Sequence, residues 1–166
     1  MDGTRWLDEQ EQHTWRSYLA ATHLLATQLD RELQRDSQIP HTYYEILVRL
    51  SEAPERALRM SDLADASESS RSRLSHAVAR LEKTGWVRRE GCPTDRRGAF
   101  AILTDAGFTA LAAAAPAHVE SVRLHLFDRL TREQVNQLAT ICDQIISGLR
   151  EEAAEPVIQG SPREVA

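Results

Sequence analysis

The chain has 166 residues, of which 42% are hydrophobic and 27% charged, with a net charge of -5; this length suits one domain, or one small domain with extra dimerising helices. Seven glycines and six prolines exclude a collagen-like or low-complexity chain, and two cysteines are too few for a disulfide framework. The longest nearly uncharged apolar stretch, 110–117, is far shorter than the ~20 residues of a membrane helix. The N-terminus lacks a basic and then apolar signal pattern, which predicts a cytoplasmic protein.

Positive charge is concentrated in one part of this acidic chain. Between Arg71 and Arg97 there are eight arginines and lysines and three acidic residues, so this segment carries +5 and the remainder -10. A basic region in an acidic protein attracts nucleic acid locally and limits non-specific binding elsewhere. A solvated surface on which charges happen to cluster would show the same number of basic and acidic residues. The order of the predicted elements is therefore needed to choose between this interpretation and nucleic-acid binding.

Two helices are predicted before the basic region. The segment from Trp6 to about Arg35 contains no glycine or proline, and its apolar residues recur at three- and four-residue steps, which predicts a long helix with one apolar face. A second helix is predicted over about 41–50, after Pro40, and 51–56 is predicted to be a loop.

The basic region opens with a short helix, a turn and a second helix. Ser61 is the expected N-cap of the short helix, and the small polar residues 67–70 should end it. The next helix, 70–84, places Ser, Arg and His residues on its outer faces and stops at Gly85. This arrangement is typical of a helix-turn-helix. The residues expected to be buried on the second helix are Leu74, Ala77, Val78 and Leu81.

A β-hairpin is predicted next, because 86–90 and 99–103 are strand-like and the residues between them, 91–98, are turn-forming. Several arginines give this hairpin a basic tip.

The C-terminal part is predicted to be helical. Thr104 should cap a long helix that runs to about Leu130. Thr131 and Gln134 fit a capping box that opens a last helix. The segment 151–166 is predicted to be a disordered tail.

In this order, the elements resemble the MarR family of winged-helix transcriptional regulators, over about residues 10–150. The Asp-x-Arg motif of the wing and the Leu-Thr-x-x-Gly turn after it are each moderately specific for this family, and their occurrence together in this order is strong evidence of resemblance. The matching segments are Ser61-Asp-Leu-Ala64, Leu81-Glu-Lys-Thr-Gly-Trp-Val87, Asp95-Arg-Arg97 and Leu103-Thr-Asp-Ala-Gly107.

The resemblance implies a mainly α fold with a small β-hairpin wing. Residues 1–150 would form a single MarR-like domain, with a winged-helix DNA-binding region at 40–104 and dimerisation helices at 7–35 and 105–149. These terminal helices are too long and apolar for a domain of roughly 60 residues to cover, which independently favours a two-fold homodimer. The dimer would place two recognition helices about 34–36 Å apart on a near-palindromic operator in double-stranded DNA. Repression is the family's commoner mode.

Roles in DNA binding are assigned by position in the family's motifs. Arg71 and Arg73 are expected at base edges, because a guanidinium can bridge guanine O6 and N7. Arg97 matches the wing arginine that enters the minor groove, and Asp95 would support the wing by pairing with an arginine. The other expected DNA-binding residues, on the helix front or at phosphates, are Ser69, Ser70, His76, Arg88 and Arg96.

The resemblance also implies a pocket for a small aromatic or phenolic effector, where the first, second and long C-terminal helices meet the winged helix. Aromatic walls, one cation and one titratable group suit a carboxylate or phenolate. The alternative is that the apolar members are core and that the arginine pairs with an acid. The expected lining is Trp15, Arg16, Leu19, His23, Tyr43 and Leu47.

Metal- and redox-responsive regulators are alternatives within the same fold. His118 and His125 are seven residues apart and could share a helix face, and His41 opens the second helix, but no compact Cys/His cluster exists and no cofactor is predicted. Cys92 lies in the wing and could be oxidised, whereas Cys142 lies on an apolar stripe and is expected to be a small core residue.

Enzymes and protein-binding adaptors are the other classes. The sequence has no Gly-rich phosphate loop, His-Glu-x-x-His or Gly-x-Ser-x-Gly motif, so no catalysis is predicted. A winged-helix adaptor that binds only proteins would not need the basic front face, which favours DNA.

Overall fold

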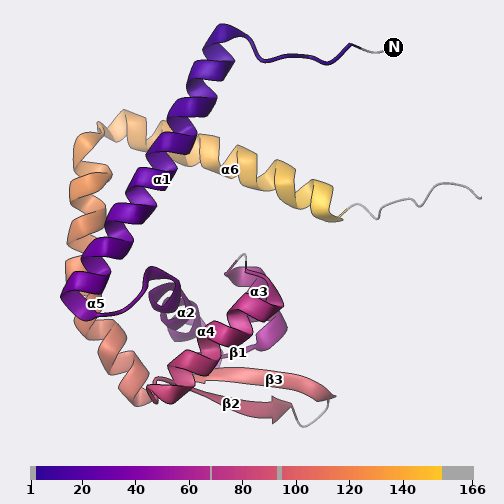
Figure 1. The fold of residues 1–166 in the computed structure, drawn as a ribbon, viewed down its shortest axis with the longest axis vertical. Coiled ribbons are helices and arrows are strands. Elements are labelled where there is room, and N and C mark those ends of the chain that lie inside the picture. Colours follow the sequence, from indigo (N-terminus) through magenta and orange to yellow (C-terminus); the bar gives the residue numbers. More distant parts are fainter. Residues whose placement is uncertain (1–2, 68, 93–94, 155–166) are drawn as a thin grey trace, which may run out of the picture. The chain divides into compact units, whose positions relative to one another are not determined.

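The fold is taken from a computed structural model, which describes residues 3–67, 69–92 and 95–154, without the side chains of 95–97 and 152–154. The chain divides into two units at His125 and Leu126, each described by itself (Figure 1). Both are mainly helical, and the wing is a small sheet, which confirms the predicted fold class. The first unit contains α1 (Glu9–Ser37), α2 (His41–Glu52), β1 (Ala57–Arg59), α3 (Met60–Ala66), α4 (Arg71–Lys83), β2 (Val87–Cys92), β3 (Asp95–Leu103) and α5 (Asp105–His125).

α1 begins at Glu9 rather than at Trp6. Asp8 is its N-cap: the Asp8 carboxylate accepts from the Glu11 backbone N–H at 2.8 Å, and the Glu11 carboxylate accepts from the Asp8 N–H at 2.9 Å. This capping box satisfies two amides that the helix itself leaves unpaired. Trp6 therefore precedes the helix and is 83% exposed.

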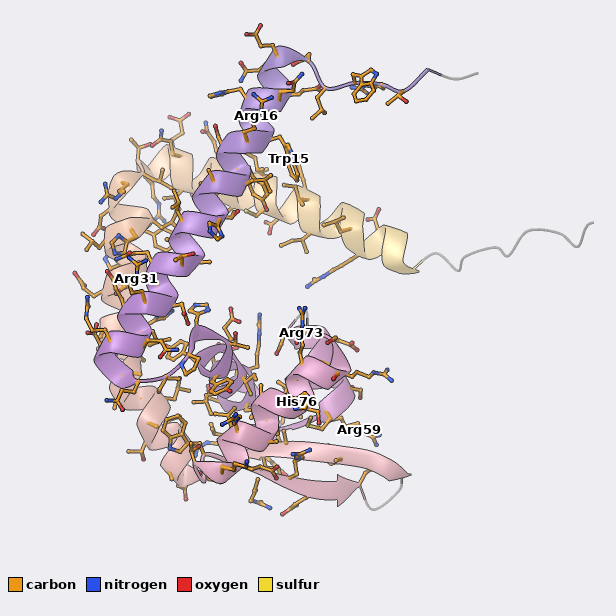
Figure 2. The ribbon with its side chains drawn as sticks, in the orientation of Figure 1. Trp15, Arg16, Arg31, Arg59, Arg73 and His76 are labelled. Carbon is orange, nitrogen blue, oxygen red and sulfur yellow. The ribbon has the colours of Figure 1, made fainter. Side chains whose placement is uncertain are left out.

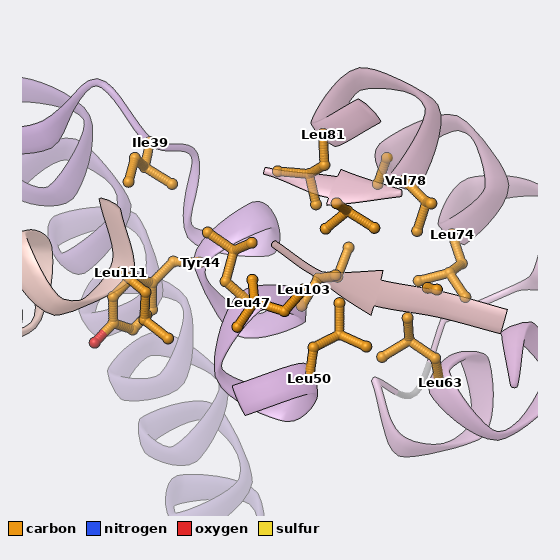
Figure 3. Packing of buried hydrophobic residues seen from close by; sticks show 14 of the residues in the cluster. Ile39, Tyr44, Leu47, Leu50, Leu63, Leu74, Val78, Leu81, Leu103 and Leu111 are labelled. Atoms are coloured by element: carbon orange, nitrogen blue, oxygen red, sulfur yellow. The ribbon is translucent and has the colours of Figure 1, made fainter. Parts of the chain in front are cut away.

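The core of the first unit lies between α2, α3, α4 and the sheet (Figure 3). It contains all four residues that were expected to be buried on α4, which confirms that prediction. Leu47 and Leu50 from α2 have no exposed surface, and α5 adds Leu111 at the edge. Burying side chains of this size stabilises a fold by roughly 1.5–3 kcal/mol each. The buried side of α4 therefore packs against this core, and its outer side is exposed to solvent. The largest fully buried residues are Ile39, Ile46, Leu47, Leu50, Leu63, Leu74, Leu81, Val78 and Val87.

The wing is a three-stranded antiparallel sheet in the order β1-β3-β2. β1 was not predicted; it pairs with β3 from Ala57 opposite Ile102 to Arg59 opposite Phe100. The predicted turn over 91–98 was too long, because β2 continues to Cys92 and β3 begins at Asp95. Pairing with a neighbouring strand outweighs the turn preference of glycines in this segment.

The two helices of the helix-turn-helix begin differently from each other. Ser61 is not the N-cap of α3: that position is held by Arg59, because β1 runs directly into the helix. The Ser61 hydroxyl donates to Asp62 Oδ1 at 2.9 Å instead. Ser70 is the N-cap of α4, and its hydroxyl accepts from the Arg73 N–H at 3.3 Å.

Thr104 joins the end of α4, the start of the wing and the start of α5. Its hydroxyl lies 2.7 Å from the Gly85 carbonyl oxygen and 3.1 Å from that of Trp86, and it accepts from the Gly107 N–H at 3.0 Å. The Thr104 N–H also donates to the Trp86 oxygen at 3.0 Å. The predicted cap at Thr104 is therefore confirmed. α5 ends at His125, not at Leu130.

The second unit contains a 3-10 turn (Phe127–Arg129) and α6 (Arg132–Ala154). The predicted capping box is confirmed: the Thr131 N–H donates to Gln134 Oε1 at 2.9 Å, and the Gln134 N–H donates to Thr131 Oγ1 at 3.2 Å. Because α6 continues to Ala154, the expectation of a disordered tail was wrong for 151–154; the rest of that tail lies outside the described residues. No helix in the described part of the chain is long and apolar enough to cross a membrane.

Candidate nucleic-acid interface

α4 presents a polar, basic face on the side opposite its buried stripe. Successive residues of a helix turn by about 100°, so positions 72, 76 and 83 lie opposite Leu74, Val78 and Leu81, and positions 73 and 80 lie at one edge of this outward face. The residues on this outward face are all exposed. They are Ser72, Arg73, His76, Arg80 and Lys83.

Arg71 and Arg73 lie on different sides of α4, because two residues correspond to about 200° of rotation. Arg73 lines a shallow groove with His76 and Arg80, on the side that faces α2 (Figure 2). Arg71 lines a cleft toward the wing, together with Arg89. The two expected base-reading arginines therefore have different surroundings.

The remaining expected DNA-binding residues have varied positions. Ser69 is half-buried before α4, and the hydroxyl of Ser70 already serves as a helix cap. Arg88 forms an ion pair with Glu90 on the same strand, and about half of its side chain is exposed. Asp95, Arg96 and Arg97 belong to β3, but their side chains lie outside the described part of the chain, so their roles remain predictions.

Several residues of the basic surface were not among the expected contacts. Ser72, Arg80 and Lys83 follow from the helical period of the buried stripe, which could have identified them. Arg59 and Arg89 could not be found in this way, because their places depend on how the strands pair with one another.

Arg89 connects the wing to α4 through Glu82. The Glu82 carboxylate accepts from the Arg89 backbone N–H at 3.0 Å and from its Nε at 2.7 Å, and it lies 2.6 Å from Nη2. Both guanidinium contacts, from Nε and from Nη2, go to Oε2, and Oε1 binds the backbone N–H. Two charge-assisted contacts to one carboxylate give the guanidinium a defined direction. This contact fixes where the side chain of Arg89 lies relative to α4.

A polar junction joins α1 to α5, which lie side by side in the first unit. His125 Nε2 lies 2.9 Å from Glu32 Oε1, and Gln28 Nε2 donates to the same oxygen at 2.7 Å. Hydrogen bonds from Ser121, His125 and Gln28 outweigh the effect of burial and lower the pKa of Glu32 to about 2. Glu32 is therefore a carboxylate at neutral pH.

His118 packs at the start of α2. Its ring centroid lies 4.5 Å from that of Tyr44 and 5.5 Å from that of His41. Burial, together with the neighbouring His41, lowers the pKa of His118. Within the described residues, its Nδ1 has no hydrogen-bond partner. His118 and His125 thus have different neighbours, and the described side chains include no group of three or more His, Cys, Asp or Glu residues placed to hold a metal ion.

The six expected effector-pocket residues are not brought together within one chain. Trp15 and Arg16 lie toward the N-terminal end of α1 (Figure 2), and Trp15 stacks on Tyr18. Asp30, which binds the backbone of His41 at the start of α2, is about 22 Å further along α1 than Trp15. Leu19 and His23 are also exposed, whereas Leu47 is fully buried and Tyr43 is half-buried.

The two cysteines lie on different elements and differ in burial. Cys92 is buried at the end of β2, with Arg59 Nη2 3.4 Å from its Sγ. Cys142 is half-buried on α6.

Comparisons with known proteins agree with this geometry. A MarR family model matches residues 37–98. The crystal structure of Sco3205, a MarR family transcriptional regulator from Streptomyces coelicolor in complex with DNA, is 56% identical, with a TM-score of 0.86 over 90% of this chain and 93% of that one. AbsC, a MarR family transcriptional regulator from the same organism, is 45% identical, with a TM-score of 0.83 over 89% of this chain and 99% of AbsC.

A curated relative shares less of its length. The transcriptional regulator HosA of Escherichia coli O111:H- is 34% identical over 91 residues, which span 55% of this chain and 65% of HosA. The similarity to Sco3205 extends over nearly all of both chains, and the fold is a winged helix with a basic outward face on α4. The chain therefore belongs to the MarR family of DNA-binding transcriptional regulators.

Proposed function

We propose that the protein is a repressor that binds a near-palindromic operator as a homodimer, with α4 of each chain in the major groove. The outward face of α4 carries this proposal, because its exposed side chains are serine, histidine, arginine and lysine, without a carboxylate among them. Arg73 is the proposed base-reading arginine. It extends from the side of this face, and its guanidinium geometry suits guanine O6 and N7.

Exposed apolar side chains on the long helices support the homodimer. Trp15 and Leu19 on α1, Val119 on α5, and Ile141 and Leu149 on α6 are each 45–62% exposed. Ile141, Ile145 and Leu149 recur every four residues and form a stripe along α6. A second copy of the chain would cover these surfaces by a two-fold interface, the commonest arrangement in soluble oligomers. Light scattering at micromolar concentration should give twice the 18.7 kDa mass of one chain; a mass of one chain would contradict the dimer.

The operator can be obtained by selecting bound DNA from random duplexes. The selected sequences should contain two inverted half-sites whose centres are one helical turn, about 10 base pairs, apart. Arg73→Ala should weaken binding to this operator by about 1–3 kcal/mol and relax sequence choice at one position of each half-site. The matched control is Arg31→Ala, which replaces an exposed arginine on α1. This variant should bind the operator like the wild type. Equal binding to operator and random duplexes would refute sequence-specific recognition.

We further propose that a small aromatic or phenolic anion releases the DNA. Support comes from the exposed Trp15–Tyr18 stack beside Arg16, which offers aromatic surface next to a cation. Such a ligand would favour a spacing between the two wings of the dimer that does not match successive major grooves. A coupling free energy of ~1–3 kcal/mol between ligand and DNA binding would weaken DNA binding 5- to 150-fold. Titrating salicylate-like compounds into the protein–operator complex tests this proposal. Arg16→Ala and His23→Ala should prevent release; release that both variants retain would place the effector elsewhere.

A further inference from the structure

A cleft between α4 and the wing is lined by three arginines from three different elements. Arg59 comes from β1, Arg71 from the start of α4 and Arg89 from β2. Ser75 of α4 lines it as well, together with the backbone of β3 at Gly98 and Ala99. The volume of this cavity is about 390 Å³. We refer to it as the arginine cleft.

The charge of the arginine cleft is predominantly positive in the part of the chain that the structure describes. Glu82 offsets the charge of Arg89, whose side chain nevertheless remains 32% exposed. Arg71, at the start of α4, is exposed and lines the same cleft. Asp62, which accepts the Ser61 hydroxyl, is not among the residues that line the cleft. A concave surface with fixed guanidinium groups attracts anions more strongly than the same charges on a flat surface.

The neighbouring elements indicate which anion fits. A helix inserted in the major groove lies between two sugar-phosphate strands, and an element flanking the helix meets one of these strands. The wing flanks α4 on the side of Arg71, and the arginine cleft separates them. A strand bordering the groove would therefore run along this cleft.

We propose that the arginine cleft binds phosphodiester groups of the DNA strand that borders the major groove, with Arg71 of α4 and Arg89 of the wing contacting them. This inference rests on the proposed docking of α4. It assigns Arg71 to the sugar-phosphate backbone of the DNA, and it leaves the reading of bases to the outward face of α4 around Arg73 and His76. Glu82 contributes as a positioning residue, because its Oε2 binds Nε and Nη2 of the Arg89 guanidinium while its Oε1 binds the Arg89 backbone N–H.

Salt dependence separates a phosphate contact from a base contact. Each phosphate neutralised by a protein cation contributes about 0.9 to the slope of log K against log salt concentration. Because the proposed homodimer carries each arginine twice, Arg71→Ala and Arg89→Ala should each reduce the magnitude of this slope by about 1.8 and weaken binding to operator and random duplexes by the same factor. Arg89→Lys keeps the charge and should restore the slope. Arg31→Ala removes the same charge away from the cleft and should leave the slope unchanged.

The measurement uses the full chain and two duplexes of equal length, the selected operator and a random sequence. Circular dichroism verifies the fold of each variant; Arg71→Ala, which changes an exposed side chain, remains informative if Arg89→Ala unfolds. Wild-type slopes for Arg71→Ala and a folded Arg89→Ala would overturn the proposal. The proposal would also be overturned if Arg71→Ala weakened binding to the operator but not to the random duplex, because Arg71 would then read bases. If the wild type showed no sequence preference, the proposed operator recognition would fail, while slopes on random DNA would still test the arginine cleft.

Discussion

Gly107 in the first turn of α5 offers a sharp test of how the wing is attached. The Cβ of an alanine here would lie 2.8 Å from Leu103 Cδ1 and 2.9 Å from the Trp86 carbonyl carbon, and closer still to the Trp86 oxygen. Ordinary van der Waals contacts of a Cβ begin at 3.4 Å. Two of the three groups belong to the backbone, which cannot rotate away as a long side chain can.

The expected cost of Gly107→Ala follows from these contacts. Overpacking of this kind costs about 1–3 kcal/mol. Displacing the Trp86 oxygen also strains the bonds it accepts from Thr104, each worth about 0.5–1.5 kcal/mol. Alanine's better helix propensity returns at most about 1 kcal/mol. The net loss should therefore be about 2–4 kcal/mol, which lowers the Tm by roughly 5–15 °C for a chain of this size.

Thermal unfolding followed by circular dichroism measures this loss. Gly148→Ala is the matched control, since Gly148 is a helical glycine on α6 with nothing within 4 Å of its added Cβ. It should leave the Tm unchanged or raise it slightly. A Gly107→Ala protein as stable as the wild type would refute the assignment of a close backbone approach.

Three further predictions concern acid stability and the core. Glu32 is a carboxylate held by hydrogen bonds, so its contribution is complete above its ordinary pKa of 4.5 and is lost as the pH falls toward about 2; Glu32→Gln should flatten the acid-unfolding curve there, and an unchanged curve would contradict this role. Folding lowers the pKa of His118 below its ordinary 6.5, so the unfolded chain binds the proton more readily and stability falls as the pH drops below 6.5. His118→Phe should lose less stability between pH 6.5 and pH 5; equal losses would argue against a buried neutral imidazole. Leu47→Ala should cost about 2–5 kcal/mol in urea unfolding, because the side chain is fully buried, and a loss under about 1 kcal/mol would mean that the core closes over the missing atoms.

The parts of the fold that could be predicted from sequence are those fixed by local interactions. The buried stripe of α4 follows from a 3.6-residue period. Thr104 and Thr131 were recognisable as caps because each hydroxyl satisfies an amide three residues later. These features depend on residues within one turn of each other, so no knowledge of distant segments is needed.

The features that sequence could not predict depend on distant partners. β1 is a strand because β3 supplies its hydrogen bonds, and three residues, Ala57–Arg59, are too few to show an alternating pattern. Ser61 was mistaken for a cap because this strand runs unrecognised into α3. The expected effector pocket joined α1 residues near Trp15 to Leu47, since a linear sequence does not reveal which part of a long helix meets α2.

The Thr104 connection has a mechanical consequence. The Thr104 hydroxyl binds Gly85 in the loop after α4, Trp86 just before the wing and Gly107 in the first turn of α5, so hydrogen bonds to one residue connect these three parts. α5 extends about 31 Å from Thr104, so tilting it by 10° would move its far end by about 5 Å, close to one helical turn. Conversely, moving the His125 end of α5 by about 5 Å would rotate the helix by only about 10° at Thr104. We therefore expect a large movement at the far end of α5 to change the orientation of its first turn, next to α4 and the wing, by only a small angle.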